Sequence, residues 1–313
     1  MKTNITRRNF IKQTGVLSGA AAVASSPLLS ACTQALTSSD FKLSLAQWSL
    51  HQAIFAGAID PLNFAKVAKQ DFGISAVEYV NQFFKDKARD KGYINQMKQI
   101  AADEGVKSLL IMIDGEGYLG DGNESQRIQA VENHYQWVEA AKALDCHSIR
   151  VNAAGEGTEE EVQQNAIDGL ARLSTFAKDF DINIIVENHG GYSSSGKWLS
   201  QVISSVNMPN CGTLPDFGNF CIAKGVDGSC EKNYDRYQGM KELMPYAKGV
   251  SAKSHDFDEN GNEINTDFTK MLSIVKDSGF TGYIGVEYEG KTLSEYEGIR
   301  ATKALLEKTI ASL

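Results

Sequence analysis

Proline, histidine and basic residues are scarce in this chain. Only five prolines and five histidines occur among 313 residues, and 31 Lys and Arg stand against 39 Asp and Glu. So few prolines, with an ordinary glycine content, exclude a collagen-like or proline-rich chain and favour a globular protein. The net charge of −8 argues against a nucleic-acid partner, because an acidic surface repels phosphate groups.

Two common site motifs do not appear where they would be expected. The sequence has no C-x-x-C spacing, which excludes the usual zinc-ribbon and dithiol redox motifs, and its first loops lack the G-x-G-x-x-G run of a dinucleotide site. Beyond residue 32 only Cys221 and Cys230 lie close together among the cysteines, the others being Cys146 and Cys211. An oxidising compartment would permit a disulfide between Cys221 and Cys230, and free thiols are the alternative.

The first 31 residues have the pattern of an export signal. Arg7 and Arg8 precede an apolar run of small residues, which resembles a twin-arginine signal, and "LSAC" resembles a lipobox ending at Cys32. We therefore predict a signal peptide over residues 1–31, lipidation of Cys32, a polar tether over residues 32–40 and a protein anchored to the membrane on the periplasmic side through its lipid alone. A cytoplasmic helix with a chance arginine pair is the alternative. Cleavage would leave 27 of the 31 basic residues against 39 acidic ones, a net charge of −12.

Short apolar segments alternate with amphipathic stretches through the rest of the chain. Helical spacing marks eight amphipathic stretches, each following an apolar segment of strand length. Strict alternation without a linker predicts a single (β/α)8 TIM barrel forming the catalytic domain over residues 41–313, with a doubly wound sheet as the alternative. The predicted strands are 41–49, 74–81, 107–114, 147–153, 182–189, 211–217, 249–255 and 282–289.

Acidic residues stand where three of these strands end. "IIVENHGG" ends a strand on Glu187, "GTLPDFGN" ends the next on Asp216, and "YIGVEYEG" ends the last on Glu287. In a barrel these side chains converge at the C-terminal mouth, and like charges in an apolar mouth require a cation. "SAKSHDF" adds Lys253 and His255, two residues apart and so on one face of a strand. These residues predict one divalent metal ion (Mn²⁺, Mg²⁺, Co²⁺ or Zn²⁺), with Glu187, Asp216, His255 and Glu287 as ligands; the oxygen-rich donor set suits Mn²⁺, Mg²⁺ or Co²⁺ more than structural zinc.

Four motifs, "VENHGG", "LPDFGNF", "SAKSHDFD" and "GVEYEG", resemble those of the sugar phosphate isomerase/epimerase family of xylose-isomerase-like TIM barrels, in an exported branch. The resemblance spans residues 41 to 310 and implies that Glu187 and Glu287 also act as acid and base. The family places its ligand histidine three residues before a strand-seven acid, where this chain has Lys253. Because a protonated lysine cannot bind a metal, we assign His255 as the fourth ligand and Lys253 as a catalytic electrophile.

Further polar residues near the strand ends are predicted to contact the substrate. Asn219 stands where epimerases of this family often carry a substrate-binding histidine. An internal ion-pair network is an equal alternative for Glu78 and Arg150, and Trp48 borders the mouth, where it would stack on a sugar. The predicted substrate-binding residues are His189, Asn219, Gln47, His51, Asn81, Glu116, Arg150 and Asn152.

These features predict a metal-dependent isomerase or epimerase of a non-phosphorylated sugar or keto sugar, which removes a proton next to a carbonyl to form an enediolate. A lyase or hydrolase of 3-keto-glycosides would use the same site. An apurinic endonuclease shares the barrel but needs many histidines. A non-catalytic sugar-binding lipoprotein is the alternative outside enzymes. The expected partner is a small carbohydrate, and a homodimer is possible.

Overall fold

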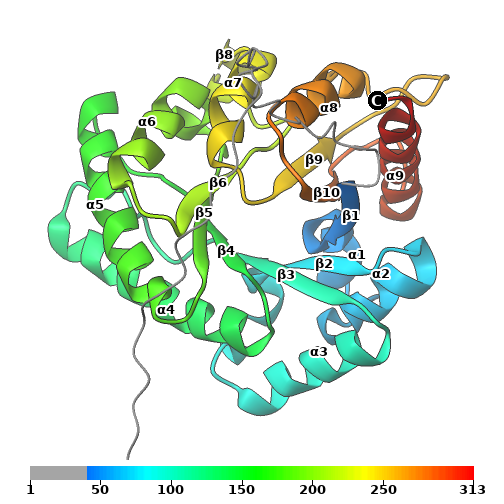
Figure 1. Ribbon diagram of the computed structural model, residues 1–313, viewed down its shortest axis with the longest axis horizontal. Helices are drawn as coiled ribbons and strands as arrows, with labels where there is room; N and C mark the ends of the chain where they lie inside the picture. Colours follow the sequence, from blue (N-terminus) through cyan, green and yellow to red (C-terminus); the bar gives the residue numbers. More distant parts are fainter. Residues whose placement is uncertain (1–40) are drawn as a thin grey trace, which may run out of the picture. The chain divides into compact units, whose positions relative to one another are not determined.

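Residues 41–313 are described by the computed structural model, and they form eight parallel strands that alternate with helices (Figure 1). The predicted signal peptide, Cys32 and the tether lie outside the described residues. Each of the eight predicted strands is present and is one to three residues shorter than predicted. The parallel strands are β1 (Phe41–Ala46), β2 (Ala76–Val80), β3 (Lys107–Met112), β4 (Ser148–Val151), β5 (Asn183–Glu187), β6 (Cys211–Leu214), β9 (Val250–Ser254) and β10 (Gly282–Tyr288).

The sheet closes on itself. Its strand order is β6-β5-β4-β3-β2-β1-β10-β9, and the two end strands are joined by a parallel bridge between Asp216 and Ser251. The Phe217 amide donates to the Ser251 carbonyl at 3.0 Å, and the Ser251 amide donates to the Pro215 carbonyl at 2.9 Å. The single (β/α)8 barrel predicted from the alternation is therefore confirmed.

The helices surround the strands (Figure 1). Their starts follow ordinary capping: Asp60 caps the turn that leads into α2, and Thr158 forms a capping box with Glu161 at the start of α5. No helix from residue 41 onward combines the length and the apolar character needed to cross a bilayer. The helices are α1 (His51–Phe55), α2 (Phe64–Phe72), α3 (Lys91–Asp103), α4 (Glu124–Ala143), α5 (Glu159–Lys178), α6 (Gly196–Val206), α7 (Arg236–Leu243), α8 (Phe268–Asp277) and α9 (Glu295–Ser312), with 3-10 turns η2 (Gln47–Leu50), η3 (Pro61–Asn63), η4 (Asn81–Lys87), η5 (Gly191–Ser194) and η6 (Met244–Tyr246).

Side chains of β5 alternate between two apolar layers. On β5, Ile184 and Val186 pack in the layer between strands and helices, whereas Ile185 packs in a second cluster inside the barrel. Leu214 of β6 and Met112 of β3 belong to the same inner cluster. This alternation confirms the predicted parity of β5, and it fixes the direction of Glu187, two residues after Ile185, towards the barrel interior.

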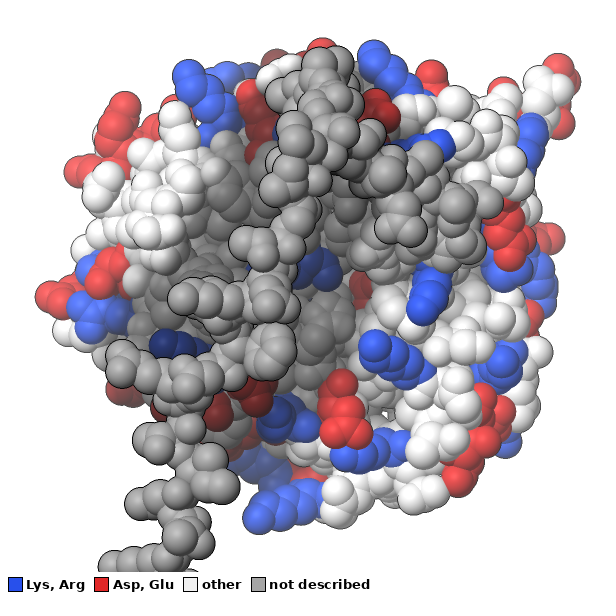
Figure 2. All heavy atoms as spheres, in the orientation of Figure 1, with Lys and Arg blue, Asp and Glu red and all other residues white. Residues whose placement is uncertain are grey.

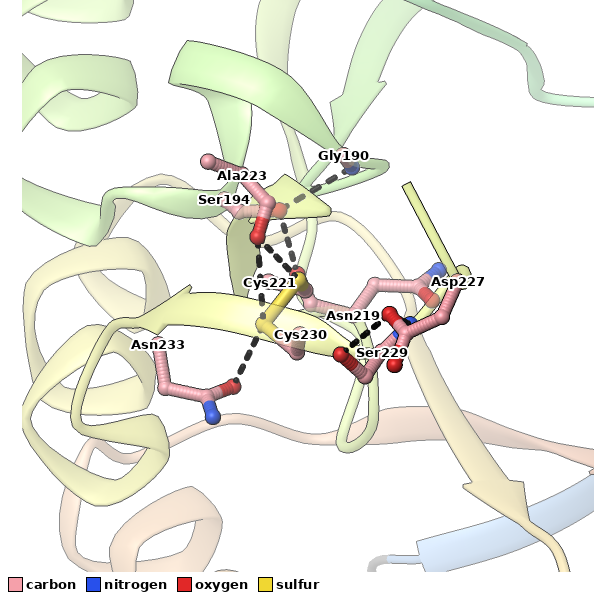
Figure 3. Close-up of a disulfide and its surroundings, with 9 residues drawn as sticks. All are labelled: Gly190, Ser194, Asn219, Cys221, Ala223, Asp227, Ser229, Cys230 and Asn233. Carbon is pink, nitrogen blue, oxygen red and sulfur yellow. Dashed lines mark hydrogen bonds between the residues drawn. A yellow bond between two sulfur atoms is a disulfide. The ribbon is translucent and has the colours of Figure 1, made fainter. Parts of the chain in front are cut away.

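An antiparallel hairpin interrupts the alternation after β6. Strands β7 (Cys221–Lys224) and β8 (Cys230–Asn233) pair with each other, and Cys221 is bridged to Cys230 with a Cα–Cα distance of 5.7 Å (Figure 3). Sequence analysis left this disulfide open and did not predict the hairpin. The available signal was Asp227-Gly228 between the two cysteines, a dipeptide typical of hairpin turns. Cys146 and Cys211 are free and buried.

A G-x-G-x-x-G run does occur, after β3, at Gly115, Gly117 and Gly120. It is no dinucleotide cradle, because the helix that would have to begin within the run begins only at Glu124. Gly120 instead packs against the backbone of Ala154 at a distance that leaves no room for a side chain.

Candidate active site

Three buried carboxylates meet at the C-terminal ends of the strands. Glu187 is the last residue of β5, Asp216 follows β6 by two residues, and Glu287 lies near the end of β10. One oxygen of each carboxylate lies within 4.8 Å of the others, and their side chains are at most 3% exposed. The structure therefore brings together the three acidic residues that the strand ends predict.

Ser251 links two of these carboxylates. Its hydroxyl lies 2.7 Å from Asp216 Oδ2 and 2.7 Å from Glu287 Oε2. One hydroxyl has a single proton to donate, so it satisfies only one of the two oxygens when both carboxylates are ionised. Without a cation, the Asp216–Ser251–Glu287 chain is complete only when one of the acids carries a proton.

The protonation of the cluster agrees with this geometry. Burial raises the pKa of Asp216 to about 8, with Glu187 and Glu287 adding to the shift against the opposing charge of Lys253. Burial likewise raises the pKa of Glu287, and the neighbouring carboxylates Glu187 and Glu289 add to it while Lys253 opposes it. Neighbouring carboxylates therefore make Asp216 and Glu287 harder to ionise, which is the situation that a divalent cation relieves.

Glu187 keeps one oxygen open. Its Oε1 accepts a hydrogen bond from Asn219 Nδ2 at 2.9 Å. Its Oε2 forms an ion pair with Arg150 Nε at 2.8 Å that lies outside hydrogen-bond geometry, so within residues 41–313 this buried oxygen accepts no hydrogen bond. An orphaned carboxylate oxygen beside two other carboxylates is suited to a metal ligand, so the residues present fit a divalent ion.

Lys253 approaches the cluster from β9. Its side chain is 3% exposed, and its Nζ lies 2.7 Å from Glu289 Oε1 and 3.6 Å from Glu287 Oε1. Burial alone would lower the pKa of Lys253, but Glu287, Asp216 and Glu289 outweigh it and raise that pKa well above its usual value. Lys253 is therefore an ammonium group, as the sequence-based prediction of an electrophile requires.

His255 is not brought into the carboxylate cluster. Strand β9 ends at Ser254, so the two-residue period that would place Lys253 and His255 on one face stops before His255. The residue instead lines a cavity of about 350 Å³ together with Gly218, Arg236 and Glu289. The structure supplies three of the four predicted ligands and gives no support to His255 as the fourth.

Asn188 is a residue that sequence analysis missed. Its Nδ2 donates to the carbonyls of Asp216 and Asn219, both at 3.1 Å, and its Oδ1 accepts from the Asp216 amide at 2.8 Å. The side chain therefore ties the end of β5 to the segment that carries Asp216. The available signal was its position directly after Glu187, at the end of a strand whose residues 184–186 are all apolar.

Arg150 and Asn152, predicted to bind substrate, are engaged with Asp114. Arg150 Nη1 and Asn152 Nδ2 donate to Asp114 Oδ1 at 2.9 and 2.7 Å. Burial would raise the pKa of Asp114, but the charge of Arg150 and the hydrogen bonds lower it to about 2. For Arg150 this supports the alternative of an internal ion-pair network.

Three other predicted substrate contacts are occupied by structural hydrogen bonds. Gln47 Oε1 accepts from the Val80 amide at 2.9 Å, and Asn81 exchanges two hydrogen bonds with the backbone of Asp114. Glu116 accepts from the Trp137 indole at 3.0 Å. The contacts of Gln47 and Asn81 join neighbouring strand ends, and that of Glu116 joins the segment after β3 to α4, so all three are positioning contacts.

The remaining predicted contacts lie nearer the solvent. His51 stacks on Trp48 with ring centroids 4.7 Å apart, and Trp48 packs against Phe83. His189 is exposed, two residues beyond Glu187. These groups leave faces open for a substrate.

Glu78 is a fourth buried acid, on β2. Ser44 Oγ donates to its Oε1 at 2.6 Å, and its Oε2 has no hydrogen-bond partner within the described part of the chain. Burial raises the pKa of Glu78 to about 7. Among the described contacts Glu78 forms no ion pair with Arg150. The ion-pair network therefore joins Arg150 to Asp114 and Glu187 and leaves Glu78 out.

Comparison with solved structures shows the same fold in sugar-processing proteins. The chain is similar to a D-tagatose 3-epimerase-like protein (19% identity, TM-score 0.65, covering 87% of this chain and 98% of that one). It is also similar to the IolI protein with a bound zinc atom (15%, 0.67, 87% and 98%) and to 3-keto-D-glucoside 4-epimerase, YcjR, from E. coli (12%, 0.62, 86% and 99%). No curated protein sequence matches the chain.

A family model described as the xylose isomerase-like TIM barrel matches residues 65–309. The match includes β2 to β10 and all three carboxylates of the cluster. By fold and by this match, the chain belongs to the xylose isomerase-like TIM barrel family.

Proposed function

We propose that the protein is a divalent-metal-dependent isomerase or epimerase that transfers a proton next to the carbonyl of a non-phosphorylated sugar or keto sugar. The observation that carries this proposal is the buried cluster of Glu187, Asp216 and Glu287, in which one oxygen of each carboxylate lies within 4.8 Å of the others. The single proton of the Ser251 hydroxyl cannot satisfy both Asp216 and Glu287 when they are ionised. The proposal is also supported by similar folds named as a 3-epimerase-like protein and a keto-glucoside 4-epimerase, one similar structure holding zinc.

Glu187, Asp216 and Glu287 would hold one ion of Mn²⁺, Mg²⁺, Co²⁺ or Zn²⁺. Such an ion supplies polarisation of a carbonyl oxygen and a neighbouring hydroxyl, which acidifies the C–H bond between them. Asn188 and Ser251 hold the carboxylates in register, since each bonds groups from two adjacent strands.

Glu187 and Glu287 are placed to share the proton transfer. They lie on β5 and β10, which are separated by four strands in one direction of the closed sheet and by two in the other, so they would face a substrate from different sides of the barrel. One carboxylate removes a proton and the other returns it, and return to the opposite face of the carbon gives epimerisation.

Lys253 and Asn219 assist this transfer. Lys253 is an ammonium 3.6 Å from Glu287, and it would donate to the substrate oxygen on which charge develops. Asn219 Nδ2 holds Glu187 Oε1, which fixes the direction in which that carboxylate presents its other oxygen.

The test is solvent exchange. Protein purified without chelator is analysed for bound metal and then incubated with candidate keto sugars in D₂O, where NMR should show deuterium at the carbon beside the carbonyl. Asp277→Asn, which changes an exposed carboxylate on α8, is the matched control for carboxylate substitutions. Turnover without deuterium uptake in metal-loaded enzyme contradicts the mechanism.

We also propose export of the protein to the periplasmic side with Cys32 lipidated. The Cys221–Cys230 disulfide supports an oxidising compartment, where such bonds persist. Mass spectrometry of the N-terminal peptide tests this proposal, and we expect a diacylglyceryl-modified Cys32 at the new N-terminus. Protein found in the cytoplasmic fraction with residues 1–31 still attached would contradict it.

A further inference from the structure

A second cavity opens at the C-terminal face, on the side of β4 and β5. Its volume is about 610 Å³, within the range of small-molecule sites. Three segments form its walls: the loop after β4 at 153–155, the loop after β5 at 189–192, and strand β7 of the disulfide hairpin. No residue of the carboxylate cluster lines it.

The cavity adjoins the cluster through two short segments. His189 lines the cavity and lies two residues beyond Glu187 on the same strand end. Cys221 also lines it and lies two residues beyond Asn219, whose Nδ2 holds Glu187. Two residues of the cavity wall therefore lie two positions along the chain from Glu187 and from the Asn219 side chain that bonds it.

Polar side chains form hydrogen bonds with the backbone of the loops that line the cavity. Ser194 Oγ accepts from the Gly190 amide at 3.0 Å and donates to the Asn219 carbonyl at 2.9 Å, which joins the β5 loop to the start of the hairpin (Figure 3). Both Ser193 and Ser194 are buried. The disulfide then fixes β7 against β8, so the hairpin wall keeps its shape.

The lining is small and largely apolar, with donors at its edge. Ala153, Ala154 and Ala223 leave space, Tyr192 presents a half-buried ring, and Lys224 and Lys232 are exposed. Half-exposed aromatic rings suit the apolar face of a sugar, and ammonium groups donate to hydroxyls. Such a surface matches a second sugar ring.

We propose that this cavity is a subsite for the second sugar of a disaccharide-type glycoside. The keto-sugar ring lies at the carboxylate cluster, and the sugar attached through its glycosidic oxygen lies between Tyr192 and the hairpin. This inference rests on the proposed function and names its substrate class: the enzyme acts on keto-glycosides in preference to free keto sugars.

The test compares two substrates in wild type and in two filled variants. Ala223→Trp and Ala154→Trp place an indole in the cavity, and Ala311→Trp, exposed on α9, is the matched control. Wild type should exchange the proton of a 3-keto-disaccharide with a kcat/KM at least about tenfold above that of the free 3-keto-monosaccharide, since a filled subsite adds binding energy. Both filled variants should remove that preference while leaving the monosaccharide rate within about twofold.

Failure of the subsite differs from failure of the proposed function. Equal rates for the two substrates in wild type, or equal losses for both in the filled variants, would overturn the subsite alone. If neither substrate exchanges its proton, the proposed function fails, and calorimetry then tests the subsite alone. A disaccharide without the 3-keto group should bind wild type and Ala311→Trp but not Ala223→Trp. Equal binding to all three proteins overturns it.

Discussion

The carboxylate cluster and the cavity walled by residues 153–155, 189–192 and strand β7 both lie at the C-terminal face of the barrel, but they are built differently. The cluster stands on strand ends, its side chains are buried, and its hydrogen bonds run between adjacent strands. The cavity is walled by loops, and a disulfide and two serines keep those loops in place. If the proposed function and subsite hold, the chemistry, which tolerates little displacement, stands on the strand scaffold, whereas the selection of the substrate is left to loops, whose sequences vary more readily.

Removing a carboxylate should separate the two regions most sharply. Asp216→Asn keeps the size of the side chain but removes a charged ligand from a cluster of three. We expect loss of stoichiometric divalent metal and a fall in kcat of about 10³-fold or more, comparable to the loss of a central electrostatic group. Metal analysis and exchange kinetics measure both, with Asp277→Asn as control. Full metal content in Asp216→Asn would refute the site.

Lys253 and His255 form the next comparison, since the sequence predicted His255 as the fourth ligand and the structure leaves it outside the carboxylate cluster. Lys253→Met should keep its metal and lose about 10²-fold in kcat, because it removes an ammonium from the developing charge while leaving the three ligands. His255→Ala should keep both metal and most of its turnover, because its imidazole lies outside the cluster. Loss of metal from His255→Ala would instead restore the original prediction of a fourth ligand.

That case shows how far sequence reasoning reached. Strand periodicity and the positions of Glu187, Asp216 and Glu287 predicted the barrel and the converging acids, because both depend on local patterns repeated along the chain. The same rule misplaced His255, because β9 ends one residue earlier. The clamp made by Asn188 and the bridge made by Ser251 depend on which strands become neighbours, and no local pattern records that.

Glu78 offers a buried carboxyl apart from the cluster. Its pKa, raised from 4.5 to about 7 by burial, means that the unfolded state releases this proton first as the pH rises. Stability should therefore fall between pH 4.5 and 7 and stay lowered above, by at most about 3 kcal/mol for a single group. Glu78→Gln should remove this loss: urea unfolding should show a gain at pH 8 and none at pH 4. An equal gain at both values would exclude ionisation as the cause.

The disulfide should have the smallest effect, and one confined to the hairpin side. Cys221 and Cys230 close a loop of nine residues in sequence separation, for which chain entropy gives a stabilisation of about 2–3 kcal/mol as an upper value. Cys221→Ser with Cys230→Ser should lower Tm by a few degrees, roughly in proportion. Because Glu187 and Glu287 stand on β5 and β10 and Asp216 lies two residues after β6, metal content should be unchanged, whereas the preference for a glycoside over a free sugar should weaken as the hairpin wall loosens.

Loss of metal in this double variant would show that the two regions are coupled through Asn219. This residue lies two positions before β7, and its side chain donates to Glu187. An unchanged substrate preference would show that the backbone bonds of Ser194 hold the wall without the disulfide.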